Sequence, residues 1–148
     1  MRRFIAVISL CFACVGSSWG QNIDSLKQLL SPSSNTIAQV NTLNVLSRAY
    51  KTKNTKAAIN YANQALTTAI RIKFKEGIAD SYANIGYAQA FLADDQDDPT
   101  PGYEKAASSF REAFDIYDAL YKSNRMSQNK MLVFLDGGVI TVYRDLAD

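Results

Sequence analysis

The sequence contains no histidine among its 148 residues. Without imidazole there is no Ser/His or Cys/His nucleophile pair, no histidine metal ligand and no histidine proton shuttle. Proline and glycine are also scarce, with 3 and 7 residues, which argues against a disordered or collagen-like chain. The rest of the composition, 47% hydrophobic and 20% charged, fits one ordinary globular domain. Phosphate-loop and nucleophile-elbow motifs are absent as well, so we expect neither an enzyme nor a cofactor nor a small-molecule substrate.

The chain has only two cysteines, Cys11 and Cys14, and both lie in an apolar run from Phe4 to Val15. Their C-x-x-C spacing imitates a redox motif, but an apolar segment does not stabilise a thiolate. One alternative is lipidation of Cys14, as in a lipoprotein signal. If the run is removed, the mature chain has no cysteine, and an oxidising compartment would not affect it.

Residues 1–20 predict an export signal. Arg2 and Arg3 give a positive start to the apolar run, and Ser18 and Gly20 place small residues before a cleavage site that follows Gly20. The run is shorter than the ~20 residues that a bilayer core requires, so a retained membrane span is not expected. The predicted location is the periplasm or the cell envelope, and residues 21–148 form the mature domain.

The mature chain is formally neutral. The sequence has 16 basic residues, and removing Arg2 and Arg3 leaves 14, which equals its 14 acidic residues. A nucleic-acid partner would demand a basic stripe, and a polybasic membrane anchor would demand a cationic cluster. Neutrality argues against both.

Apolar residues recur at three- and four-residue steps along most of the mature chain, which predicts helices. Asn35 or Thr36 is expected to cap the second helix, and Thr100 to cap a later one that has Pro101 at its first position. Ser109 is expected to face solvent. The predicted helical stretches are about 23–30, 37–50, 58–72, 76–92, 103–120 and 130–146, with a polar interruption at 93–102.

These helices repeat in pairs, and small residues recur at matching positions. Close helix crossings require a small side chain at the contact and bulky neighbours beside it. In the first helices of the two pairs the matching residues are Leu43, Leu46 and Ser47, then Tyr82, Ile85 and Gly86. In the second helices they are Ala58 and Ala65, then Ala106 and Ala113.

This pattern resembles the tetratricopeptide repeat. The resemblance implies an all-α fold, in which antiparallel helix pairs stack as a short right-handed solenoid. The repeats would span about 40–73 and 79–122, with a partial third repeat or a capping helix at about 128–148. Together with the export signal, the chain is similar in style to exported tetratricopeptide proteins of the Bacteroidota, many of which are sensory parts of larger signalling proteins.

The resemblance also implies a function in protein–protein interaction, with a protein or peptide as partner. In this family the first helices line a concave groove, and the matching positions include Asn41, Val45 and Asp80 beside the site that we predict. That site comprises Asn44, Arg48, Lys51, Asn84 and Tyr87. Asn84 matches the asparagine with which chaperone-binding members hold a peptide carboxylate, but Asn44 and Arg48 stand where those members carry lysine and asparagine. The carboxylate clamp is therefore incomplete.

Three alternatives remain open. The acidic run with Asp94, Asp95, Asp97 and Asp98 offers oxygen ligands to calcium, and an envelope calcium-binding protein or enzyme could be built on it. However, the expected glycine and the terminal glutamate of a calcium loop are missing. The second alternative is a structural segment that self-associates through its C-terminal helix. Residues 130–144 also fit a β-hairpin, because β-branched runs flank an Asp-Gly-Gly turn.

Overall fold

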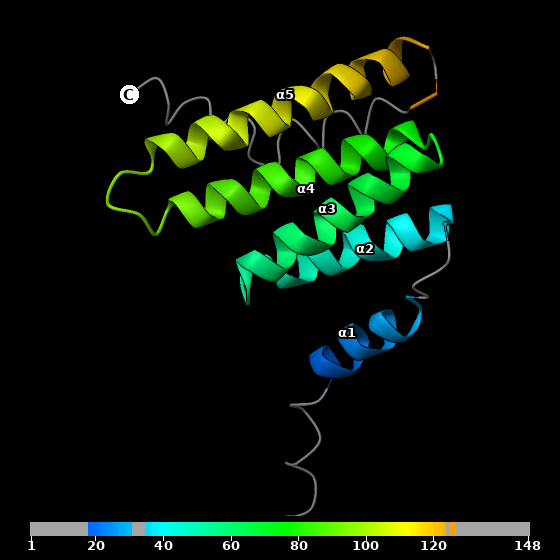
Figure 1. Cartoon of the computed structure of the whole chain (residues 1–148), viewed down its shortest axis with the longest axis horizontal. Helices are drawn as coiled ribbons and strands as arrows, with labels where there is room; N and C mark the ends of the chain where they lie inside the picture. The colour runs from blue at the N-terminus through cyan, green and yellow to red at the C-terminus, as the bar shows by residue number, and fades with distance from the viewer. Residues whose placement is uncertain (1–17, 31–34, 124, 127–148) are drawn as a thin grey trace, which may run out of the picture.

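The computed structural model describes residues 18–30, 35–123 and 125–126, and this part of the chain is all-helical. Its helices are α1 (Ser18–Gln28), α2 (Ile37–Tyr50), α3 (Thr55–Arg71), α4 (Lys75–Ala93) and α5 (Thr100–Lys122). Neighbouring helices run in alternating directions and stack in chain order (Figure 1). The predicted all-α class is confirmed for these residues. The segments 1–17, 128–148 and the hairpin alternative at 130–144 lie outside them.

The two central helix starts follow from side-chain caps. Thr36 is the N-cap of α2, and its hydroxyl oxygen accepts a 3.2 Å hydrogen bond from the backbone N–H of Gln39. Asn54 caps α3 in the same way through a 3.0 Å bond from the N–H of Ala57. Each cap satisfies one of the backbone donors that a helix start leaves without a partner. Of the two caps expected for α2, the structure selects Thr36.

A tight reversal joins α3 to α4. Lys73 has a φ of 57°, in the left-handed region, and its N–H donates to the carbonyl of Ile70. The N–H of Phe74 donates back to the carbonyl of Ala69 at 2.9 Å. This pair of bonds is a Schellman motif, which usually contains glycine at the left-handed position. The motif turns the chain sharply enough for α4 to pack against α3.

The connection between α4 and α5 is shorter than expected. The polar interruption was placed at 93–102, but α4 extends to Ala93 and α5 begins at Thr100. The N-cap of α5 is Pro99 and not Thr100. Asp98 explains this early start, because its carboxylate accepts a 3.1 Å hydrogen bond from the Thr100 N–H. A carboxylate is also favoured at the positive end of a helix.

Small side chains allow α4 to pack closely with its neighbours. Gly86 lies against the fully buried ring of Phe110 in α5. The repeated alanines Ala58, Ala65, Ala106 and Ala113 are all fully buried, which confirms their predicted place in the core. One apolar cluster gathers around Phe110 between α4 and α5, and a second one lies between α2 and α3.

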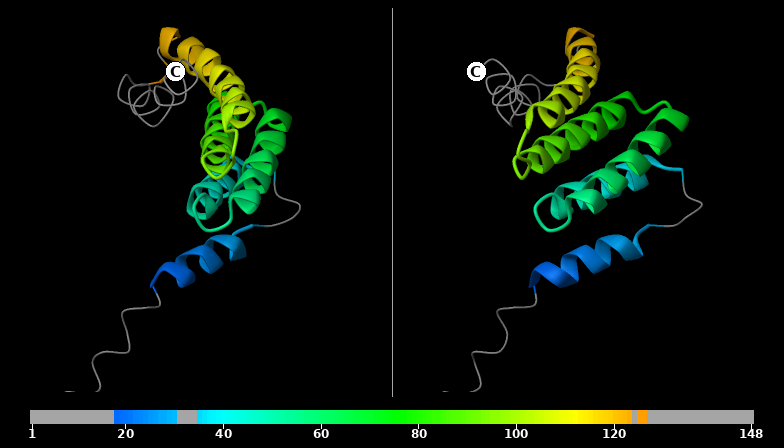
Figure 2. Two further views of the ribbon diagram at one scale, coloured as in Figure 1. Left: turned by 90° about the vertical axis from the view of Figure 1, so that its left-hand side faces the viewer. Right: turned by 60° about the vertical axis from the view of Figure 1, so that its left-hand side comes forward.

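The helices form a stack, and α2 also contacts a helix that does not directly follow it in the sequence. Consecutive helices pack against each other from α1 to α5, and α2 also packs against α4. Figure 2 shows the same order in two further views, with α1 at one end of the stack. Among the described residues, no helix is long and apolar enough to cross a membrane.

Candidate functional site

A hollow between α2 and α4 contains the residues that a groove would present. Its volume is about 300 Å³. Five of its residues are groove positions expected from the sequence, and Phe74 and Glu76 join them from the start of α4. The lining consists of Asn41, Asn44, Val45, Arg48, Phe74, Glu76 and Asp80.

Lys51 and Tyr87 lie together. The Lys51 ammonium lies 5.7 Å from the centroid of the Tyr87 ring, within the range of a cation–π contact. The same ring meets Phe110 edge-to-face, with centroids 4.9 Å apart and an interplanar angle of 68°. Burial raises the pKa of Tyr87 above its usual value. Lys51 therefore contacts the Tyr87 ring, and the Tyr87 ring packs on Phe110 in the hydrophobic core.

The exposed residue of the predicted site is Arg48. It lines the hollow from α2, one turn along from Asn44. A guanidinium carries five donors in a planar fork, so it can hold a carboxylate or two carbonyl oxygens. Arg48 is therefore an exposed cation at this hollow.

Asn44 and Asn84 differ from the expectation that they face a ligand openly. They are only 2% and 5% exposed, because α2 and α4 cross at this point. The Asn84 amide donates 3.0 Å to Asn44 Oδ1 and 3.4 Å to the Asn44 carbonyl oxygen. Ser81 Oγ lies 3.2 Å from the same Oδ1 and donates to the Gly77 carbonyl at 2.7 Å. Asn84 therefore joins the two helices, and its amide is not presented to a ligand.

Asn44 retains one unsatisfied group. Among the buried side-chain polar atoms of the described residues, its Nδ2 has no hydrogen-bond partner within the protein. A buried donor without an acceptor costs about 1–3 kcal/mol. The unsatisfied amide group therefore belongs to the buried crossing of α2 and α4.

Glu76 and Asp80 form the acidic wall of the hollow. They lie one turn apart in α4, so their side chains share one helix face. Asp80 is one of the groove positions predicted from the sequence, whereas Glu76 is not. The sequence does contain a feature that marks both residues: two carboxylates spaced i, i+4 on a helix that is otherwise rich in alanine.

Tyr117 of α5 forms a hydrogen bond with the Asp80 carboxylate. Its hydroxyl donates a short hydrogen bond to Asp80 Oδ1. Burial, followed by the negative charge of Asp80 and this bond, raises the pKa of Tyr117 well above its usual value. Tyr117 is therefore a neutral donor at neutral pH, and it fixes the position of the carboxylate.

The four aspartates of the acidic loop, considered above as calcium ligands, do not point to a common centre among the described residues. Asp94 accepts a 2.5 Å hydrogen bond from the Tyr103 hydroxyl, and Asp98 caps the Thr100 N–H. Asp95 and Asp97 are exposed. Within residues 18–30, 35–123 and 125–126, no group of three or more carboxylate or cysteine side chains could hold a metal ion. Two of the four aspartates instead position the start of α5.

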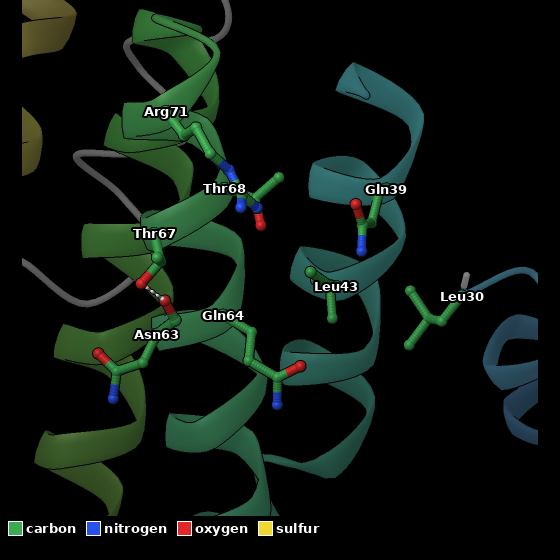
Figure 3. A pocket seen from close by; sticks show the side chains of 8 residues that line it. All are labelled: Leu30, Gln39, Leu43, Asn63, Gln64, Thr67, Thr68 and Arg71. Carbon is green, nitrogen blue, oxygen red and sulfur yellow. Dashed lines mark hydrogen bonds between the residues drawn. The ribbon is translucent and has the colours of Figure 1, made fainter. Parts of the chain in front are cut away.

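A larger hollow of about 560 Å³ separates the end of α1 from α2 and α3 (Figure 3). Two of its polar side chains form hydrogen bonds within α3. Thr67 donates 2.9 Å to the Asn63 carbonyl, and Gln64 donates 3.2 Å to the Asn60 side chain. The charged member of its lining is Arg71, on α3. This hollow presents amides and hydroxyls without a second charge, so it is a weaker candidate than the one between α2 and α4.

Comparisons with known proteins return no match: no family model, no curated protein and no solved structure is similar to this chain.

Proposed function

We propose that this chain is an exported, tetratricopeptide-like scaffold that binds a peptide segment of another protein along the groove between α2 and α4. The observation that carries the proposal is the hollow between these helices. Five of its lining residues are those that the family resemblance assigns to a concave binding surface. Two helix pairs, α2 with α3 and α4 with α5, would be its repeats.

The packing supports a repeat arrangement. In a stack of helix pairs, the first helix of one pair also meets the first helix of the next, and α2 packs against α4 in this way. The matching small residues Ser47, Ala58 and Ala106 are all buried. The right-handed superhelix and a third repeat at 128–148 belong to the proposal.

The chemistry of the groove suits an extended peptide. Such a segment carries unpaired backbone carbonyls, which Arg48 can bind through two of its donors. Tyr87 offers a rigid ring with a polar tip, the type of side chain that contributes most at interfaces. Its packing on Phe110 holds the ring in place, so little conformational entropy would be lost on binding.

Export remains part of the proposal on sequence grounds. The positive start, the apolar run and the small residues before position 21 support an envelope location. A scaffold of this type in the envelope would suit the sensory part of a larger signalling protein.

The test is capture of partners by the full chain. Purified protein and an Arg48→Ala/Lys51→Ala variant are immobilised, and envelope extract of the encoding organism is passed over both. This pair is preferred to a change at Tyr87, whose removal would also disturb Phe110. An Arg111→Ala/Lys105→Ala variant removes two exposed cations from α5 and serves as the matched control.

We expect the groove variant to lose partners that the wild type and the control both retain. Circular dichroism should show equal helix content for all three proteins. If all three capture the same partners at the same salt concentration, the groove is not the binding surface.

A further inference from the structure

We propose that the larger hollow, between the end of α1 and helices α2 and α3, binds a small organic acid that carries one carboxylate and a short apolar group (Figure 3). Arg71 and Thr68 bind the carboxylate, and Leu30 and Leu43 contact the apolar group. This inference goes beyond the proposed function, because the larger hollow shares no lining residue with the groove between α2 and α4. It is carried by three features of the larger hollow: the charge of its lining, an unpaired hydroxyl and its enclosure.

The charge of the lining favours an anion. Among the described residues that line the larger hollow, Arg71 is the single charged side chain, and no carboxylate accompanies it. Arg71 also forms no ion pair within the part of the chain that the structure describes, so its guanidinium is not committed to a protein carboxylate. A guanidinium can donate two parallel hydrogen bonds to a carboxylate, and these are stronger than hydrogen bonds to a neutral amide. A ligand with one negative charge therefore matches this lining.

Thr68 supplies a second donor beside Arg71. Thr68 is only 5% exposed, and its hydroxyl has no hydrogen-bond partner among the described residues, whereas the neighbouring Thr67 donates to the Asn63 carbonyl. The Thr68 hydroxyl is not among the fully enclosed polar atoms, and Figure 3 shows this side chain directed from α3 toward α2, close to that of Arg71. Residues three apart share one helix face. A carboxylate bound to Arg71 can therefore also accept a hydrogen bond from Thr68.

The enclosure suits a small molecule with an apolar part. The volume of about 560 Å³ lies within the range of roughly 300–1,000 Å³ that is typical of small-ligand sites. Three segments surround it, because Leu30 follows α1, Leu43 belongs to α2 and Thr68 belongs to α3. Leu43 is a buried member of the apolar cluster between α2 and α3, and Leu30 packs against that cluster. The two leucines give an apolar group of the ligand a surface on which it leaves water.

Four compounds test the inference: isocaproate, its neutral amide, acetate and the peptide acetyl-Ala-Ala-Leu with a free carboxylate. Each is titrated to millimolar concentration into the full ¹⁵N-labelled chain, and the backbone signals of Thr68 and Arg71 are followed by NMR. We expect isocaproate to bind at least about fivefold more tightly than its amide, because the carboxylate gains charge-assisted hydrogen bonds. Acetate should bind at least about fivefold more weakly than isocaproate, because it lacks most of the apolar group. The peptide should bind no more tightly than isocaproate, because the hollow encloses a small molecule only.

Arg71→Gln should abolish most of the preference for isocaproate over its amide. Lys56→Gln removes an exposed cation from the same helix but outside the larger hollow, so this matched control should leave the preference unchanged. Thr68→Val keeps the shape of the side chain and removes the hydroxyl, so it should weaken isocaproate binding about threefold or more. Equal affinities for isocaproate and its amide would overturn the inference, as would absence of binding or a preference that survives Arg71→Gln. Tighter binding of the peptide than of isocaproate would overturn the assignment to a small molecule.

Discussion

Asn84 Nδ2 lies 3.0 Å from Asn44 Oδ1, so one hydrogen bond between two buried amides joins α4 to α2. The residues are 40 positions apart in the sequence. Among the described residues, it is the side-chain amide contact that joins these two helices. The bond thus joins the two helices that line the hollow, α2 and α4.

This amide pair predicts a measurable coupling. Asn84→Ala should lower the free energy of unfolding by about 1–3 kcal/mol, because Asn44 loses its partner in a buried environment. Asn44→Ala and the double variant complete a double-mutant cycle, for which we expect a coupling of about 1 kcal/mol. Urea denaturation of the four proteins gives the values. Strict additivity of the two single changes would show that the bond does not contribute.

Gly86 is predicted to tolerate no side chain. A Cβ at this position would lie 2.7 Å from Cε1 and 2.8 Å from Cδ1 of Phe110, whose ring is fully buried. Gly86→Ala should therefore destabilise by about 1–3 kcal/mol through overpacking, even though alanine favours a helix by about 1 kcal/mol over glycine. Thermal denaturation measures the effect. Combining the change with Phe110→Leu should cost less than the sum of the two changes, and a fully additive result would contradict this explanation.

The adjacent residues Ser108 and Ser109 allow one hydrogen bond between α4 and α5 to be tested. It was expected to face solvent, but its hydroxyl is half-buried and donates 2.8 Å to Gln89 Oε1. Ser109→Ala should cost about 0.5–1.5 kcal/mol more than Ser108→Ala, because only the first change removes a hydrogen bond between α4 and α5. Ser108 is exposed in the same helix, so the difference in helix propensity cancels. Equal unfolding midpoints in urea would refute the expected difference.

Because Tyr117 is buried and hydrogen-bonded, we expect the folded protein to lose stability at high pH. Its pKa is raised in the folded state above the usual value of 10. The unfolded chain therefore releases this proton first, and the stabilisation present below about pH 10 declines as the pH rises above it. The decline is at most about 1.4 kcal/mol per pH unit for one group. The unfolding free energy of the wild type should fall more steeply above pH 10 than that of Tyr117→Phe. Parallel curves for the two proteins would contradict the assignment.

Export predicts a processed N-terminus. Mass spectrometry of envelope fractions should find a chain that begins at Gln21, because the small residues Ser18 and Gly20 precede it. A Gly20→Leu variant should be processed more slowly, since a signal peptidase requires a small residue there. Recovery of the chain in the cytoplasm with Met1 intact would rule out this part of the proposal.

The sequence by itself determined the helices and most of the core. Apolar residues at three- and four-residue steps favour an amphipathic helix. Thr36 and Asn54 begin their helices through hydrogen bonds to residues only three positions away. The buried alanines were also predictable, because a small residue repeated at matching positions indicates a close helix crossing. Even Arg48 and Asp80 were placed near the hollow by their helix positions.

Only the tertiary structure decided which polar residues are structural and which can meet a ligand. Asn44, Asn84 and Ser109 have no local feature that separates a buried amide or hydroxyl from an exposed one. Their partners lie 20 to 40 residues away, so the pairing depends on how α2, α4 and α5 cross. The role of Glu76 as a wall of the hollow likewise depends on that crossing, because helical periodicity fixes the face of a residue but not the helix that will lie opposite it.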